Sequence, residues 1–243
     1  MPNSQSFPIN EDARLIPVWS MVAAGITTAS GRGYHILWYL SQTGVTFIGP
    51  MEGRQQTIGL LAEAAPQPTE LARPEAIAEL ARRYFTSHGP AAIQDFMWWS
   101  GLTATDAKAG LEANKASLTA ETIEGREYWL PKAAITDGSP AASFLLPGFD
   151  EYLLGYKDRG AVLSADYAAK IIPGGNGVFF PTIILGGRVA GSWKRLIKRD
   201  HVLITLSPFR SFTPDEIASL QAPAEQYGRF VGLPPKVVYA PVS

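Results

Sequence analysis

The 243-residue sequence contains no cysteine, and this absence excludes several kinds of site at once. Without thiols there is no disulfide framework, no thiolate zinc site, no iron–sulfur cluster and no cysteine nucleophile. The sequence is also poor in histidine, since His35, His88 and His201 are the only three and are far apart. No His-x3-His or His-Glu-x2-His spacing is present, so we expect neither a metal nor a cofactor.

The chain also has little net charge and no long apolar run. Its 21 Lys and Arg side chains nearly balance 22 Asp and Glu side chains, which argues against a uniformly basic coat for nucleic acid but permits a local basic face. No stretch approaches the ~18 uncharged apolar residues of a membrane span. The first ten residues lack the Lys or Arg of a secretory signal. We therefore expect a cytoplasmic protein with no membrane segment.

Common catalytic motifs are missing as well. The sequence has no Gly-x-Ser-x-Gly elbow and no Ser-x-x-Lys pair. The glycine cluster at residues 174–177 lacks the order of a phosphate-binding P-loop and is typical of a turn.

The middle of the chain has the element order of a winged helix. Pro74 suits the first turn of a helix whose apolar residues repeat with helical spacing, and Gly89-Pro90 ends that helix and begins a second. Thr103 can cap a third helix, which runs to about residue 114. Strands are expected at 118–123 and 126–130, joined by a turn. Two helices, a tight turn, a third helix and a hairpin make a winged helix.

Similar elements are expected on either side. Before the winged helix, the pattern predicts a short helix at 15–24, a second helix from about residue 30 and strands at 45–48 and 57–61. After it, we expect a hairpin formed by 178–185 and 188–197, a strand at 201–206 and a helix from Thr213 to about residue 230.

The predicted fold class is therefore α+β, with tandem winged-helix units (helix-turn-helix plus β-hairpin) and a C-terminal β-hairpin and helix region. The predicted domains are a partial winged helix at 1–66, a winged helix at 67–135, and an α+β region with a basic β-hairpin at 136–243.

Residues 145–159 place five charged side chains in an apolar and aromatic context. One interpretation is a structural ion network in which Asp150 or Asp158 pairs with Arg159, because buried charges are costly unless they are paired. The other is that Asp150, Glu151 or Asp158 orients water or acts as an acid or base beside a cleft. Spacing alone favours the structural interpretation.

A local excess of positive charge occupies residues 188–199. On a strand, Trp193 and Arg195 share one face, and Lys194 lies on the other. Cations beside an aromatic ring suit contact with phosphates or a wedge between bases. A solvated edge strand is the alternative. We predict DNA contact by these residues: Arg188, Trp193, Lys194, Arg195, Lys198 and Arg199.

Several short motifs of the sequence are informative together. They are Arg82-Arg83-Tyr84-Phe85, His88-Gly89-Pro90-Ala91, Asp95-Phe96, Trp99-Ser100-Gly101-Leu102, Leu146-Pro147-Gly148-Phe149-Asp150-Glu151-Tyr152, Tyr156-Lys157-Asp158-Arg159, Asn176-Gly177 and Gly191-Ser192-Trp193-Lys194-Arg195. These motifs resemble those of the AlkZ-like family of tandem winged-helix proteins, which includes bacterial DNA glycosylases that excise alkylated bases and unhook interstrand crosslinks. The resemblance extends from about Gly31 to Leu233.

The resemblance implies winged helices around a basic, concave DNA-binding channel. It also implies two catalytic glutamines separated by one apolar residue, in a first winged helix near the N-terminus. No two glutamines of this sequence have that spacing, and adjacent Gln55 and Gln56 do not reproduce it. The sequence is therefore expected to begin after that first winged helix.

Three functions remain open at this stage. The first is a non-catalytic relative that binds double-stranded DNA, damaged DNA included, through the basic hairpin and a recognition helix at 103–114. The second is an active glycosylase in which Asp150, Glu151 or Asp158 orients water. The third is an interaction module that self-associates through surfaces left by the absent domain, such as the apolar run at 15–26.

Overall fold

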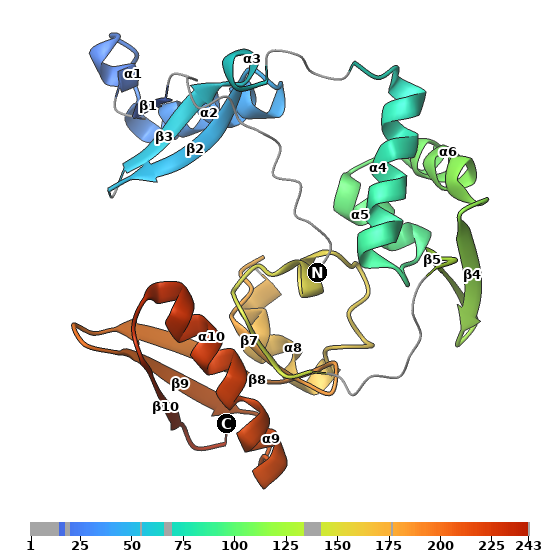
Figure 1. The fold of residues 1–243 in the computed structure, drawn as a ribbon. Helices are drawn as coiled ribbons and strands as arrows, with labels where there is room; N and C mark the ends of the chain where they lie inside the picture. Colours follow the sequence, from blue (N-terminus) through green and yellow to red (C-terminus); the bar gives the residue numbers. More distant parts are fainter. Residues whose placement is uncertain are drawn as a thin grey trace. The chain divides into compact units, whose positions relative to one another are not determined.

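The structure is a computed structural model that describes residues 15–17, 20–53, 55–65, 70–133, 142–175 and 177–242. It divides into two compact units, Met1–Leu71 and Ala72–Ser243, which are described separately. Helices and sheets are mixed in both units (Figure 1), so the predicted α+β class is confirmed.

The first unit is a small antiparallel sheet with one longer helix. Strand β1 (Leu15–Pro17), helix α1 (Ser20–Ala23), the 3-10 turn η1 (Ala29–Gly31), α2 (Arg32–Gln42), β2 (Thr46–Glu52), β3 (Gln55–Leu60) and α3 (Leu61–Ala64) follow one another, and the strand order is β1-β3-β2. The helix expected over 15–24 was wrong in its first half, where β1 pairs with β3. Proline cannot donate within a helix but is tolerated on an edge strand such as β1.

The second unit begins with three helices and a hairpin. These are α4 (Arg73–His88), α5 (Ile93–Ser100), α6 (Ala104–Asn114), β4 (Leu118–Ile123) and β5 (Arg126–Pro131), close to the predicted ranges. The Thr103 hydroxyl caps α6 by accepting from the backbone of Asp106. Helices α4 and α6 approach closely at Gly110, where a Cβ would lie 3.0 Å from the side chains of Ala81 and Ile77.

The rest of the second unit is built on a five-stranded sheet with the order β10-β9-β8-β7-β6. Its strands are β6 (Phe144–Leu146), β7 (Thr182–Leu185), β8 (Arg188–Ile197), β9 (Val202–Pro208) and β10 (Pro235–Tyr239). Strand β8 has its predicted bounds, whereas β7 is shorter than predicted and begins just after Pro181. Strand β10, which pairs parallel to β9, was not predicted.

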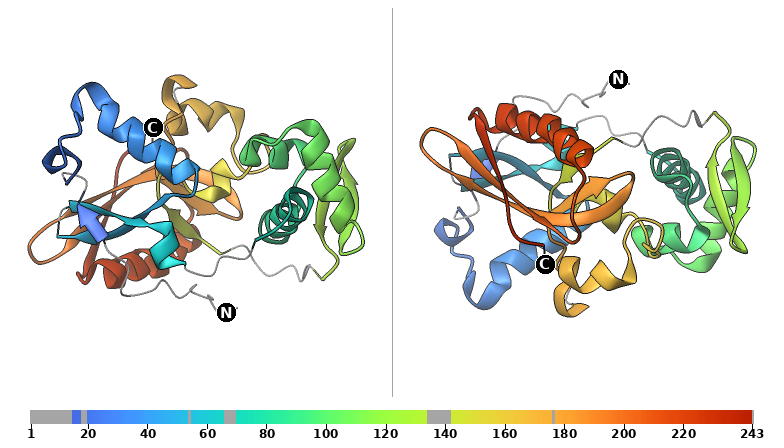
Figure 2. Two further views of the ribbon diagram at one scale, coloured as in Figure 1. Left: turned by 90° about the horizontal axis from the view of Figure 1, so that it is seen from above. Right: turned by 90° about the horizontal axis from the view of Figure 1, so that it is seen from below.

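Both faces of this sheet are buried. Ile183 packs in a core with Leu220 and Ala224, whereas its neighbour Ile184 packs with Leu153 and Ile171 on the opposite face. Helix α10 (Gln221–Val231) and helix α8 (Ala165–Ile171) accordingly lie on opposite sides of the sheet (Figure 2).

The single helix expected over residues 213–230 is two helices, α9 (Pro214–Ser219) and α10, separated at Leu220. Pro223 lacks the backbone N–H that would bond to the carbonyl of Ser219, so a continuous helix would lose a hydrogen bond there. Helix α7 (Glu151–Leu154) and the turn η2 (Pro173–Gly175) complete the described elements.

Within the described residues, no helix is long and apolar enough to cross a bilayer. The same part of the chain holds no group of three or more His, Asp or Glu side chains placed to bind a metal ion.

Candidate functional site

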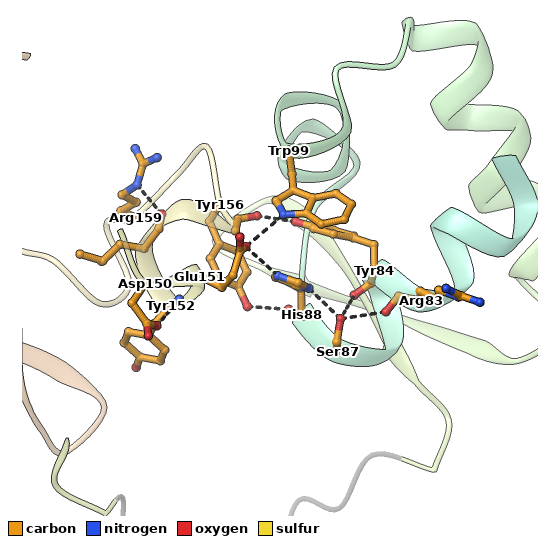
Figure 3. A network of polar contacts seen from close by, with 12 residues as sticks. Arg83, Tyr84, Ser87, His88, Trp99, Asp150, Glu151, Tyr152, Tyr156 and Arg159 are labelled. Atoms are coloured by element: carbon orange, nitrogen blue, oxygen red, sulfur yellow. Dashed lines mark hydrogen bonds and ion pairs between the residues drawn. The ribbon is translucent and has the colours of Figure 1, made fainter. Parts of the chain in front are cut away.

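The side chain of Glu151 joins the two parts of the second unit. Glu151 is the first residue of α7, and its Oε2 accepts a 3.0 Å hydrogen bond from the indole Nε1 of Trp99 on α5. The same oxygen lies 3.3 Å from Nε2 of His88, the last residue of α4 (Figure 3). A carboxylate in this position can accept a proton from water or from a ligand.

Two tyrosine hydroxyls add further contacts around His88. Tyr84 donates a 2.8 Å hydrogen bond to the carbonyl of Gly155, and Tyr156 donates one of 2.8 Å to the carbonyl of His88. Burial raises the pKa of Tyr156 to about 12 and raises the pKa of Tyr84 further, so both hydroxyls stay protonated near neutral pH. We call Tyr84, His88, Trp99, Glu151 and Tyr156 the Glu151 cluster.

The Glu151 cluster borders a cavity of about 620 Å³. Its walls include Ser87, Phe144 and Tyr152. The carboxylate of Glu151 is 61% exposed, so it can meet a ligand, while the His88 side chain is only 14% exposed. The cavity therefore offers the accessible carboxylate of Glu151, in contact with a histidine and an indole, and its wall also includes the partly exposed Asp150.

The predicted ion network of Asp150, Asp158 and Arg159 does not form. The Asp150 side chain caps α7 by accepting from the backbone N–H of Tyr152 at 2.9 Å. Asp158 pairs instead with Arg126 on β5. Arg159 donates its Nε hydrogen bond to the carbonyl of Leu153 at 2.6 Å. The network prediction was wrong because nearby backbone groups bind the side chains of Asp150 and Arg159, and the distant Arg126 pairs with Asp158.

Asp158 and Arg126 lie in a second cavity, of about 630 Å³, whose wall also includes Arg188 and the buried Asp95. A hydrogen bond from the backbone N–H of Gly160, together with Arg126, holds the pKa of Asp158 below its usual value. Asp158 is therefore an ionised carboxylate already committed to two donors. Both oxygens of Asp158 are engaged, whereas Glu151 makes its contacts through Oε2 alone and Asp150 through Oδ1 alone.

The predicted basic residues separate into two groups. Arg188 begins β8, whereas Lys198 and Arg199 follow its last residue, roughly 30 Å away along the strand. Lys194, Arg195, Lys198 and Arg199 are all exposed at that far end. We call residues 193–202, which form the end of the β8–β9 hairpin, the basic arm.

The basic arm has one open edge. Strand β7 pairs with β8 only from Arg188 to Ser192, and residues 193–197 pair with β9 alone. A groove of about 620 Å³ runs along this part of β8, lined by Lys194, Arg195 and Phe180 among others. Arg195 stacks on Tyr227 of α10, with 5.7 Å from its guanidinium carbon to the ring centroid.

Trp193 is not available as an aromatic contact for DNA. Its side chain is 4% exposed, and its indole Nε1 donates a 2.7 Å hydrogen bond to the carbonyl of Leu146. It also meets the ring of Tyr227 edge-on at 5.2 Å. The strand places Trp193 on the face of the sheet that α10 covers. The prediction that Trp193 contacts DNA was therefore wrong, and Trp193 is a core residue.

Sequence reasoning missed most of the Glu151 cluster. Tyr84, His88, Trp99 and Tyr156 all lie in the family motifs, but none of them was assigned a functional role from the sequence. The available signal was chemical: a histidine and a tryptophan capable of donating hydrogen bonds lie at or near the C-terminal ends of α4 and α5. Only the tertiary fold brings them to Glu151.

The comparisons with known proteins agree with this fold and define its class. A family model described as "DNA glycosylase AlkZ-like" matches residues 15–230. This chain belongs to the AlkZ-like DNA glycosylase family, as its motifs suggested.

Two relatives come from Streptomyces sahachiroi. The interstrand DNA cross-link repair glycosylase of that organism is 28% identical over 226 residues, which cover 86% of this chain and 58% of that protein. The solved structure of its DNA glycosylase AlkZ matches with a TM-score of 0.69 at 25% identity, covering 92% of this chain and 65% of that one. This chain therefore spans less than two thirds of the length of these relatives.

Proposed function

We propose that this chain is a winged-helix protein that binds double-stranded DNA, damaged DNA included, through the basic arm. The observation that carries the proposal is the charge of the arm, where four cations face one carboxylate, Asp200. Among the described residues, the side chains of Lys194, Lys198 and Arg199 have no hydrogen-bonding or ion-pair partner. Exposed cations without partners are free to neutralise phosphates.

The proposal takes residues 67–135 as one winged helix, because α4, α5, α6 and the β4–β5 hairpin follow in that order. It takes residues 1–66 as a partial unit, since α2 followed by β2 and β3 repeats the second half of that order, and residues 136–243 as the α+β region.

Charge distribution favours the arm over α6 for the proposed phosphate contacts. On α6, Asp106 pairs with Arg73, and Glu112 pairs with Lys115. The β4–β5 hairpin is acidic, with three glutamates and one arginine between residues 118 and 131. Neither element attracts DNA as the arm does.

The arm can also offer an apolar contact. Leu196 and Ile197, at the end of β8, are 51% and 57% exposed. Minor-groove proteins insert apolar side chains of this kind beside cations. We assign to these two residues the wedge role that burial denies to Trp193.

The salt dependence of DNA binding tests the proposal. The logarithm of the binding constant should fall linearly with the logarithm of salt concentration, with a slope of about −0.9 for each phosphate neutralised. The double variant Lys198→Ala/Arg199→Ala should make this slope shallower by up to about 1.8. Lys108→Ala removes an exposed cation of α6 and should leave the slope unchanged. Salt-independent binding, or no binding at low salt, would overturn the proposal.

A second candidate function is hydrolysis of the N-glycosidic bond of an alkylated base. It is favoured by the exposure of Glu151 in its cavity, beside His88 and Trp99. In this scheme the carboxylate accepts a proton from water as the water attacks the sugar carbon and the base departs.

Alkylated duplex DNA incubated with pure protein would test for abasic sites. Glu151→Gln should abolish the product and leave DNA binding unchanged, because the amide keeps the shape but cannot accept the proton. Asp150→Asn is the matched control, since Asp150 is occupied in capping α7. If the wild-type protein forms no abasic sites, glycosylase activity is excluded as a function.

Self-association is the third function that the sequence left open. Its support is the first unit, where Tyr34, Trp38 and Tyr39 of α2 are 70%, 56% and 62% exposed. Sedimentation over a range of concentrations tests it, and a strict monomer would contradict it.

A further inference from the structure

A row of neighbouring aromatic and cationic side chains lies in the second unit, outside the Glu151 cluster and the basic arm. The guanidinium carbon of Arg159 is 5.0 Å from the ring centroid of Trp98 and 5.0 Å from that of Phe179. The ring of Phe149 lies next, with 6.3 Å between its centroid and that of Phe179. We call Trp98, Arg159, Phe179 and Phe149 the aromatic row.

The guanidinium of Arg159 is oriented by one hydrogen bond, and its other donors are not used. Its Nε donates to the carbonyl of Leu153, and it points away from Glu151 and His88 (Figure 3). Its two terminal amino groups have no hydrogen-bonding partner among the described residues. The nearby carboxylate of Asp95 accepts instead from the backbone N–H groups of Ala92, Lys157 and Asp158. Arginine keeps its charge in such surroundings and can hold a phosphate with two parallel hydrogen bonds.

Phe149 is held in an unusual backbone conformation that exposes its ring. Its φ is +60°, in the left-handed region that residues other than glycine rarely adopt, and its side chain is 56% exposed. The neighbours fix this geometry. Gly148 packs so closely that a Cβ there would lie 2.7 Å from the carbonyl oxygen of Phe179, and Asp150 caps the following helix. Strained residues that the surroundings hold in place gather at functional sites.

Trp98 provides a second exposed face at the other end of the row, with 45% of its surface accessible. The row therefore offers two accessible rings and, between them, a cation with free donors. A planar ring stacks on the aromatic faces, and an anionic group bonds to the guanidinium. A nucleotide carries both groups, provided that its base has left the stack, because a paired base in a duplex has both faces covered.

We propose that the aromatic row binds an unpaired nucleotide of DNA, with the base stacked on Phe149 and its phosphate held by Arg159. This rests on the proposed function, since the basic arm would hold the adjoining duplex. Stacking on protein aromatics tolerates all bases, so the row selects unstacked nucleotides and not a particular sequence.

Two probes test the proposal directly. One is a duplex with a single bulged 2-aminopurine, and the other is the same duplex with 2-aminopurine paired to thymine. The protein should bind the bulged probe more tightly and quench its fluorescence on binding, because stacking on an aromatic ring quenches 2-aminopurine. Equal affinity for both probes, with no quenching of the bulged base, overturns the proposal.

Variants then assign the effect to the row. Phe149→Asn removes the ring while keeping a residue that tolerates the left-handed conformation. It should weaken binding of the bulged probe about fivefold to a hundredfold and restore its fluorescence, with little change for the paired probe. Phe149→Tyr should retain both the affinity for the bulged probe and the quenching of its fluorescence. Arg159→Lys should weaken binding of the bulged probe, because lysine cannot hold a phosphate in two parallel hydrogen bonds.

Phe230→Asn is the matched control, since Phe230 is 83% exposed on α10 and outside the row. It should leave quenching unchanged. If Phe149→Asn quenches as wild type does, the row has a structural role only. Failure of this proposal is distinct from failure of the proposed function, because the paired probe would still bind with its salt dependence intact.

Discussion

The hydroxyl of Tyr84 donates a 2.8 Å hydrogen bond to the backbone carbonyl of Gly155, which lies 71 residues further along the chain. The ring of Tyr84 also stacks on His88, with 4.6 Å between centroids. Gly155 is the point of closest approach, since a Cβ there would lie 2.5 Å from the His88 ring and 2.7 Å from the carbonyl oxygen of Glu151. Helix α4 and the segment after α7 therefore fit together only with glycine at this position.

Gly155→Ala should lower the free energy of unfolding by about 1–3 kcal/mol, because the added methyl group forces His88 away and strains a filled site. Urea unfolding measures the change. Gly160→Ala is the control, since the nearest atom to its Cβ is an oxygen of Asp158 at 3.3 Å. A Gly155→Ala protein as stable as Gly160→Ala would show that the two parts do not pack as described.

Alkaline conditions should weaken the contact made by Tyr156. Burial raises the pKa of this tyrosine from 10.0 to about 12, so the folded protein keeps a proton that the unfolded chain releases. The folded state thus binds more protons across this range, and the free energy of unfolding should fall as pH rises from about 10 to about 12. Tyr156→Phe should make the decrease shallower, and identical pH profiles for the two proteins would contradict the assignment.

Trp193→Phe should destabilise the protein without changing the salt dependence of DNA binding. The substitution removes the hydrogen bond from the indole to the carbonyl of Leu146 and leaves a space in the core, a loss of about 1–3 kcal/mol. The charges of the basic arm are unchanged, so the slope of the logarithm of the binding constant against the logarithm of salt concentration should equal that of the wild type. If Trp193→Phe weakens DNA binding and leaves stability unchanged, Trp193 contacts DNA and its assignment to the core is wrong.

Replacing Phe149 should separate its backbone cost from its side-chain role. Phe149→Asn relieves about 1 kcal/mol of left-handed strain and loses a partly exposed ring contact, so we expect stability to hold or rise slightly. Phe149→Val also removes the ring, but its branched side chain suits a positive φ poorly and should lower stability by about 1–2 kcal/mol. Thermal melts of the two variants make the comparison, and the opposite order would exclude strain at this position.

The sequence by itself determined the local elements. Helix α4 follows its apolar repeat and Pro74, α6 begins at the Thr103 cap, and the β4–β5 hairpin turns at Glu124-Gly125 as predicted. These signals depend on residues within one or two turns of each other, so they can be read along the chain. The short motifs, which led to the family, are local in the same way.

Only the tertiary structure decided which side chains meet. It paired Asp158 with Arg126 and not with Arg159, turned Trp193 into the core, and brought Trp99 to Glu151. The parallel strand β10 likewise depends on a neighbour, β9, that lies across an intervening pair of helices in the sequence. Ion pairs, burial and strand partners are contacts between distant segments, and their free energy is gained only when the whole unit packs, so no local pattern could assign them.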